Sequence, residues 1–172
     1  MHTTPINTDE SSLERVGGKG RSLAMMARNN FAVPGGFIVT ADAYRKFVSD
    51  NKLQQAILEK ARPYLREGYP AFDTCSDEIA ALILGTPISD DMVDEIKTAY
   101  SLLDDGSRPV AVRSSANAED LPDFSFAGQQ ETFLNVRGAD QVAEAVRKCW
   151  ASLWTAKAIS YRHQNGIDQG VV

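Results

Sequence analysis

The sequence has few cysteines and no long hydrophobic segment, and each of these absences argues against a class of protein. The chain of 172 residues contains two cysteines, Cys75 and Cys149, which lie far apart and have no histidine cluster beside them. A disulfide scaffold and a structural zinc site are therefore disfavoured. The longest clear apolar run, residues 79–84, is far shorter than the roughly 18 residues that a membrane span requires. We expect a reduced, cytoplasmic protein without a membrane partner.

The chain also contains fewer basic than acidic residues. Asp and Glu number 23 against 18 Lys and Arg, which gives a net charge of −5. Proteins that bind nucleic acids usually carry a basic surface, so we expect no nucleic-acid partner. Residues 1–12 are polar and contain no apolar core of a secretory signal. With 43% hydrophobic and 24% charged residues, the chain has the composition of an ordinary globular domain with one core.

Hydrophobic spacing predicts a helix-rich α+β fold with a small sheet. Short β-branched runs predict buried strands, and apolar residues at helical spacing predict helices that pack a core. Trp150 and Trp154 are assigned to this core, and His163 to the last turn of a helix, where its charge complements the helix dipole. The expected strands are 37–39, 109–112 and 131–137, and the expected helices are 41–48, 53–62, 73–84, 89–103 and 140–163.

A glycine-rich turn with one lysine precedes another helix, which should end near Asn29. The turn consists of Gly17, Gly18, Lys19 and Gly20. Glycines allow backbone N–H groups to approach a ligand, and a helix N-terminus favours an anion. The spacing matches neither the P-loop nor the dinucleotide-binding motif. Two interpretations remain open: a phosphate-binding turn, or a structural turn with a solvated lysine.

Arg113 ends a predicted strand and is followed by a long polar loop. Ligand sites of α/β domains often lie at the carboxyl ends of strands, where an arginine can hold phosphate oxygens with two hydrogen bonds. The loop, residues 114–128, is longer than the roughly 12 residues above which a loop is usually functional. A phosphate contact and a structural ion pair with Glu119 or Asp120 are equally compatible with the sequence.

Residues 126–132 contain Gly128 and Thr132 after an aromatic residue. This pattern is compatible with a glycine-hinged cover over a nucleotide or with an ordinary β-turn.

Several segments in a fixed order resemble a known family. Together they look like the N-terminal nucleotide-binding domain of the phosphoenolpyruvate synthase and pyruvate phosphate dikinase family, which includes the rifampin phosphotransferases. The resemblance covers the chain from about Leu13 to its end. The segments are residues 16–20, 33–40, 111–116, 118–122, 126–132 and 149–154.

The resemblance implies an ATP-grasp fold in which a histidine on a separate domain receives the β-phosphate of ATP and passes it to an acceptor. By position, Lys19 and Arg113 would contact the phosphates of ATP. Gly128, Thr132 and Phe133 would belong to the loop that covers the nucleotide. No residue of this chain is assigned as catalytic or as a metal ligand, and the Mg²⁺ ligands are expected outside the chain.

The resemblance also implies an organisation. Residues 1–12 are expected to form a polar tail, and residues 13–172 the first lobe of the ATP-binding domain, cut before the second lobe. The partners would then be ATP and the phosphohistidine and acceptor domains of a parent chain, which could be a homodimer. Three functions remain open: the ATP-binding part of a phosphoenolpyruvate synthase acting on pyruvate, that of a rifampin phosphotransferase, and a non-catalytic nucleotide-binding or interaction module.

Overall fold

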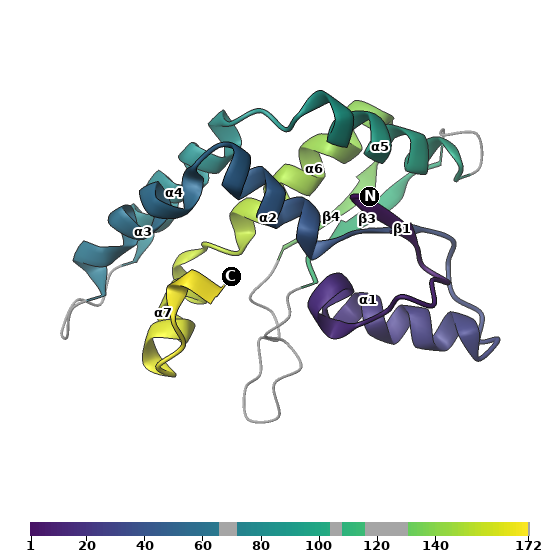
Figure 1. The fold of residues 1–172 in the computed structure, drawn as a ribbon, viewed down its shortest axis with the longest axis horizontal. Helices are drawn as coiled ribbons and strands as arrows, with labels where there is room; N and C mark the ends of the chain where they lie inside the picture. The colour runs from purple at the N-terminus through teal and green to yellow at the C-terminus, as the bar shows by residue number, and fades with distance from the viewer. Residues whose placement is uncertain (66–71, 104–107, 116–130, 172) are drawn as a thin grey trace.

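The computed structural model describes residues 1–65, 72–103, 108–115 and 131–171. Seven α-helices in these ranges surround two small antiparallel sheets. In Figure 1, α3 and α4 lie at one end of the molecule and α1 lies at the other. The helices are α1 (Leu13–Arg28), α2 (Ala41–Asp50), α3 (Leu53–Ala61), α4 (Asp73–Gly85), α5 (Asp90–Ser101), α6 (Ala139–Ser152) and α7 (Ala156–Gln164), and short 3₁₀ turns are η1 (Arg62–Tyr64) and η4 (Gln169–Val171).

The predicted α+β class with a small sheet is confirmed. Strand β1 (Thr3–Pro5) pairs with β2 (Phe37–Val39), and β3 (Val110–Arg113) pairs with β4 (Thr132–Val136). The predicted apolar stripes form the core, and both tryptophans are buried as expected. His163 lies in the last turn of α7, with its ring against the edge of Phe72. No helix in the described ranges is long and apolar enough to cross a membrane.

The single helix predicted over 140–163 is wrong, because the structure contains two helices there. Thr155 begins α7, and its hydroxyl accepts a hydrogen bond from the backbone N–H of Ala158 at 3.3 Å. Arg162 Nη1 donates to the carbonyl of Leu153 at 2.8 Å, where α6 has ended. Side-chain groups therefore satisfy backbone atoms on both sides of the break, and a local cap outweighs the continuous apolar stripe.

The polar segment at the N-terminus contains a strand that sequence analysis missed. Thr3–Pro5 pairs with β2, and Glu95 on α5 holds this strand in place. Glu95 Oε1 accepts hydrogen bonds from the backbone N–H groups of His2 and Thr3, both at 2.6 Å, and from the Thr3 hydroxyl at 3.0 Å. Burial raises the pKa of Glu95, but these hydrogen bonds together lower the pKa by more than burial raises it. The pKa of Glu95 therefore lies below its ordinary value.

We expect Glu95→Gln to lower the free energy of unfolding by about 1 kcal/mol at neutral pH, because hydrogen bonds to a charged acceptor are stronger than those to a neutral one. The folded-state pKa is depressed, so the contribution is complete above the ordinary value of 4.5 and is lost as the pH falls through the folded-state value. Urea unfolding of both chains across the acidic range measures this difference. If Glu95→Gln were still less stable than the unaltered chain at the lowest pH, the stabilising role given to the Glu95 carboxylate would be contradicted.

The strands predicted as buried are only half-buried. In β3, Val110 and Val112 pack toward the core, whereas Ala111 and Arg113 are exposed. The reason is that α6 covers one face of this two-stranded sheet, so alternate side chains point away from it. In β4, a bulge at Asn135, which has φ 57°, allows both Phe133 and Val136 to pack against the core. The position of Arg113 on the open face matters for the site.

Candidate functional site

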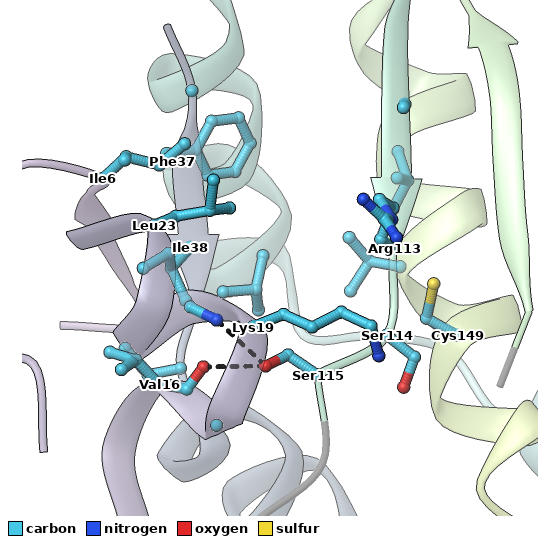
Figure 2. A pocket seen from close by; sticks show the side chains of 18 of the residues that line it. Ile6, Val16, Lys19, Leu23, Phe37, Ile38, Arg113, Ser114, Ser115 and Cys149 are labelled. Carbon is cyan, nitrogen blue, oxygen red and sulfur yellow. Dashed lines mark hydrogen bonds between the residues drawn. The ribbon is translucent and has the colours of Figure 1, made fainter. Parts of the chain in front are cut away.

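A cavity of about 850 Å³ lies between the start of α1, strands β2 and β3, and helix α6. Figure 2 shows that side chains from these separate elements point into the same space. Its wall is largely apolar, and five cationic side chains also line it: Lys19, Arg45, Arg108, Arg113 and Arg162. Arg45 forms an ion pair with Asp42, and Arg162 is buried and hydrogen-bonded to Gln169 and to the Leu153 carbonyl. The apolar lining includes Leu23, Phe37, Ile38, Val39, Val112, Val142, Val146, Trp150 and Leu153.

The glycine-rich turn lies inside α1 rather than ahead of it. Helical residues occur on both sides of Gly17, where the backbone breaks at φ 66° and ψ 173°. A Cβ at this position would lie 2.2 Å from the carbonyl oxygen of Ser115, which is closer than real atoms approach. Gly17 is therefore required twice, for a left-handed φ and for close packing against the segment that follows β3. This break places Lys19 in the first turn of the second helical part.

Lys19 and Arg113, which sequence analysis selected independently, line the same cavity. Lys19 is half-buried, and its side chain runs across the cavity toward Ser114 and Cys149 (Figure 2). Arg113 is exposed on the open face of β3, and it forms no ion pair with any acidic residue that the structure describes. The alternative partners Glu119 and Asp120 lie outside the described residues.

Thr132 and Phe133 lie on β4 beside the cavity rather than in its lining. Thr132 is exposed and stands opposite Arg113 in the strand register, whereas Phe133 stands opposite Val112 and packs against the core. Thr132 is thus the better placed of the two to approach a ligand held by Arg113. Gly128 lies outside the described residues.

Cys149 lines the cavity, which sequence analysis did not foresee, although the residue lies on the buried stripe of its predicted helix. Burial raises the pKa of its thiol, and Glu131 raises it further, whereas the charge of Lys19 lowers it; the resulting pKa is about 12. The thiol therefore stays protonated at neutral pH and is a poor nucleophile. It contributes a polarisable wall next to Lys19.

Ser115 is a second residue whose role the sequence did not reveal. Its hydroxyl donates to the carbonyl of Val16 at 3.1 Å and accepts from the backbone N–H of Gly20 at 3.2 Å. The dashed lines in Figure 2 mark these two bonds. They join the end of β3 to the turn of α1 across nearly 100 residues of sequence, a separation of 95 for the second bond, so no local pattern could indicate them.

In the part of the chain that the structure describes, no group of three or more His, Cys, Asp or Glu side chains is arranged to hold a metal ion. The described lining of the cavity contains no Asp or Glu side chain, the carboxylates that usually hold Mg²⁺. We therefore assign no magnesium contact to them.

The arrangement defines a class of site. Several cations and a helix start that meet at a largely apolar cavity suit an anionic ligand, such as a nucleotide, whose phosphates the cations can contact. Comparison with known proteins gives the family. Residues 13–172 match the family described as pyruvate phosphate dikinase, AMP/ATP-binding domain. The chain belongs to this family.

Individual relatives agree with this assignment. A probable phosphoenolpyruvate synthase of Methanothermobacter thermautotrophicus is 43% identical over 162 residues, covering 91% of this chain and 23% of the relative. A rifampicin phosphotransferase of Streptomyces sviceus is 43% identical over 166 residues, covering 95% of this chain and 19% of the relative. The phosphoenolpyruvate synthase of Escherichia coli is 42% identical over 164 residues, covering 92% of this chain and 21% of the relative. The chain thus spans about a fifth of the length of these relatives.

Proposed function

We propose that this chain binds ATP in the described cavity and that Lys19 and Arg113 contact its phosphates. The observation that carries the proposal is that these two cations, distant in sequence and on different elements, line one cavity. A guanidinium can bind phosphate oxygens through two parallel hydrogen bonds, and an ammonium adds a compact charge. Gly128, Thr132 and Phe133 are proposed to belong to the segment that covers the nucleotide, with an ATP-grasp arrangement of the complete site.

The activity of a whole protein that contains this domain is a further proposal. We infer that AMP is the leaving group when ATP phosphorylates a histidine on another domain, that water takes the terminal phosphate, and that the β-phosphate passes to pyruvate, as in a phosphoenolpyruvate synthase. The relatives named phosphoenolpyruvate synthase support this choice. The rifampicin phosphotransferase of Streptomyces sviceus, also 43% identical, supports a second candidate in which rifampin is the acceptor. A magnesium ion, whose ligands we expect outside this chain, would neutralise the negative charge of the phosphates.

We propose a cytoplasmic protein that works with phosphohistidine and acceptor domains, and a dimeric parent.

The proposed binding is tested by titrating the chain with ATP while its NMR spectrum is recorded. We expect saturable binding that is weaker than micromolar, because a ligand bound tightly is usually enclosed over most of its surface. Absence of saturable binding at millimolar ATP would contradict the proposal. Titration with inorganic phosphate, which the same two cations should bind more weakly, serves as the matched comparison.

We expect the isolated chain not to consume ATP with pyruvate, with rifampin or without an acceptor. The reason is that phosphoryl transfer requires metal ions to neutralise the charge that develops, and the described residues offer no site for them. ATP consumption by the purified chain is the measurement. The Escherichia coli phosphoenolpyruvate synthase, assayed in parallel with pyruvate, is the positive control. Sustained turnover by the chain would refute the proposal that the magnesium ligands and the phosphohistidine belong to other parts of a longer protein.

A further inference from the structure

The hydroxyl of Ser115 occupies an unusual place in α1. In a continuous α-helix, the backbone N–H of Gly20 would donate to the carbonyl of Val16, four residues earlier. Here the Gly20 N–H donates to Ser115 Oγ, and Ser115 Oγ donates to the Val16 carbonyl. The serine hydroxyl is therefore inserted into the helical hydrogen-bond ladder, a recognised cause of a helix kink.

The fit around this hydroxyl is close. Gly17, the residue at the break, has no side chain, and a Cβ there would lie 2.4 Å from Ser115 Oγ. Ser115 is half-buried, and Val16, Gly17 and Gly20 are buried. The backbone break and the inserted hydroxyl thus depend on one another: Gly17 leaves the space, and Ser115 satisfies the two backbone groups that the break separates.

The insertion connects the two cations of the site. Lys19 lies between Val16 and Gly20, the two residues that Ser115 contacts. Arg113 is the last residue of β3, and Ser115 follows it by two positions. Figure 2 shows the Ser115 bonds at the base of the Lys19 side chain, with Arg113 on the neighbouring strand. One hydroxyl therefore fixes the backbone that carries Lys19 to the strand that carries Arg113.

We propose that Ser115 is a positioning residue of the nucleotide site: its inserted hydroxyl holds α1 open so that Lys19 enters the cavity at a fixed place relative to Arg113. This inference rests on the proposed ATP-binding function. Without the hydroxyl, the Gly20 N–H can bond directly to the Val16 carbonyl. The ladder then closes and Lys19 rotates away from Arg113. Ser115 itself need not touch the ligand, since its hydroxyl is used by α1.

A double-mutant cycle separates this role from a merely structural one. We expect Ser115→Ala to weaken ATP binding by about tenfold, within the range found for directly coupled residues. In a chain that already carries Lys19→Met, the same change should have almost no effect on ATP binding, because the group that Ser115 positions is gone. NMR titration with ATP measures all four dissociation constants, and thermal melting establishes that each variant is folded. Ser22→Ala, at an exposed position of the same helix, should leave the affinity unchanged.

Two results would overturn the proposal. Either Ser115→Ala leaves ATP affinity unchanged, or it weakens binding equally with and without the Lys19 amine. A second readout needs no ATP: the rate at which an acylating reagent modifies Lys19, measured against exposed Lys52 by mass spectrometry. Ser115→Ala should change this relative rate, and an unchanged rate would refute the positioning role. If the unaltered chain fails to bind ATP, the proposed function falls, and the acylation rate alone decides the role of Ser115.

Discussion

Replacing Arg113 by methionine is expected to weaken ATP binding by ten- to a hundredfold while changing the free energy of unfolding by no more than about 0.5 kcal/mol. A hydrogen bond to a charged group contributes about 1.5–3 kcal/mol, which corresponds to this loss of affinity. Arg113 is exposed and unpaired with any described acidic residue, so its removal should leave folding almost unaffected. Lys19→Met should lower ATP affinity to a similar extent. Titration with ATP and urea unfolding measure the two quantities.

The matched control is Arg137→Met, which removes an exposed arginine just after β4 and outside the cavity lining. In a longer enzyme containing this domain, loss of Lys19 or Arg113 should slow the ATP-dependent step by two or more orders of magnitude, since a clamp on a transferring phosphoryl group contributes about 3–4 kcal/mol. The opposite pattern would identify a structural arginine. Destabilisation by about 3–5 kcal/mol with unchanged ATP binding would mean that Arg113 belongs to a buried ion pair.

Gly17→Ala is expected to destabilise the fold by about 2–4 kcal/mol. The alanine must adopt the left-handed φ of Gly17, and its Cβ would lie 2.2 Å from the Ser115 carbonyl oxygen. The obstacle is backbone, so α1 and the segment after β3 must move apart. Binding of ATP should fall as well, because these two segments carry Lys19 and Arg113. Urea unfolding gives the first effect, and titration under conditions where the variant remains folded gives the second.

Gly85→Ala makes the same chemical change at the end of α4, outside the cavity lining, where a Cβ would meet no atom within 4 Å and where φ is not positive. We expect this control to alter the free energy of unfolding by less than about 0.5 kcal/mol and to leave ATP affinity unchanged. If both alanine variants were equally stable, the close approach of Gly17 to Ser115 would not exist in solution.

The sequence predicted the parts of the site that local patterns encode. The glycines around Lys19 predicted a tight turn ahead of a helix, and the structure has a backbone break at Gly17 inside α1. The strand ending at Arg113 indicated a charged side chain at its end. Both features depend on neighbouring residues, and the structure has both at the cavity. The order of several such segments, rather than any single one, indicated the family. Whether Gly128, Thr132 and Phe133 cover a nucleotide remains a prediction.

The features that sequence analysis missed depend on distant contacts or on competition between local signals. Strand β1 is three residues long and is held by Glu95, 92 positions from Thr3. Ser115 gains its role only where it meets Gly20, 95 positions away. The break between α6 and α7 was not predicted because the apolar stripe continues through it, whereas the capping hydroxyl of Thr155 begins a new helix. Such effects follow from tertiary packing, which overrides local propensity.

The central claim is that Lys19 and Arg113 together form the phosphate-binding edge of one nucleotide site. Its most direct test is to record ¹⁵N NMR spectra of the chain during titration with ATP. We expect the largest shifts at the amides of Gly17 to Gly20 and of Ser114 and Ser115, and we expect these shifts to vanish when Lys19→Met and Arg113→Met are combined. Shifts confined to α3 and α4, or shifts that persist in the double variant, would contradict the claim.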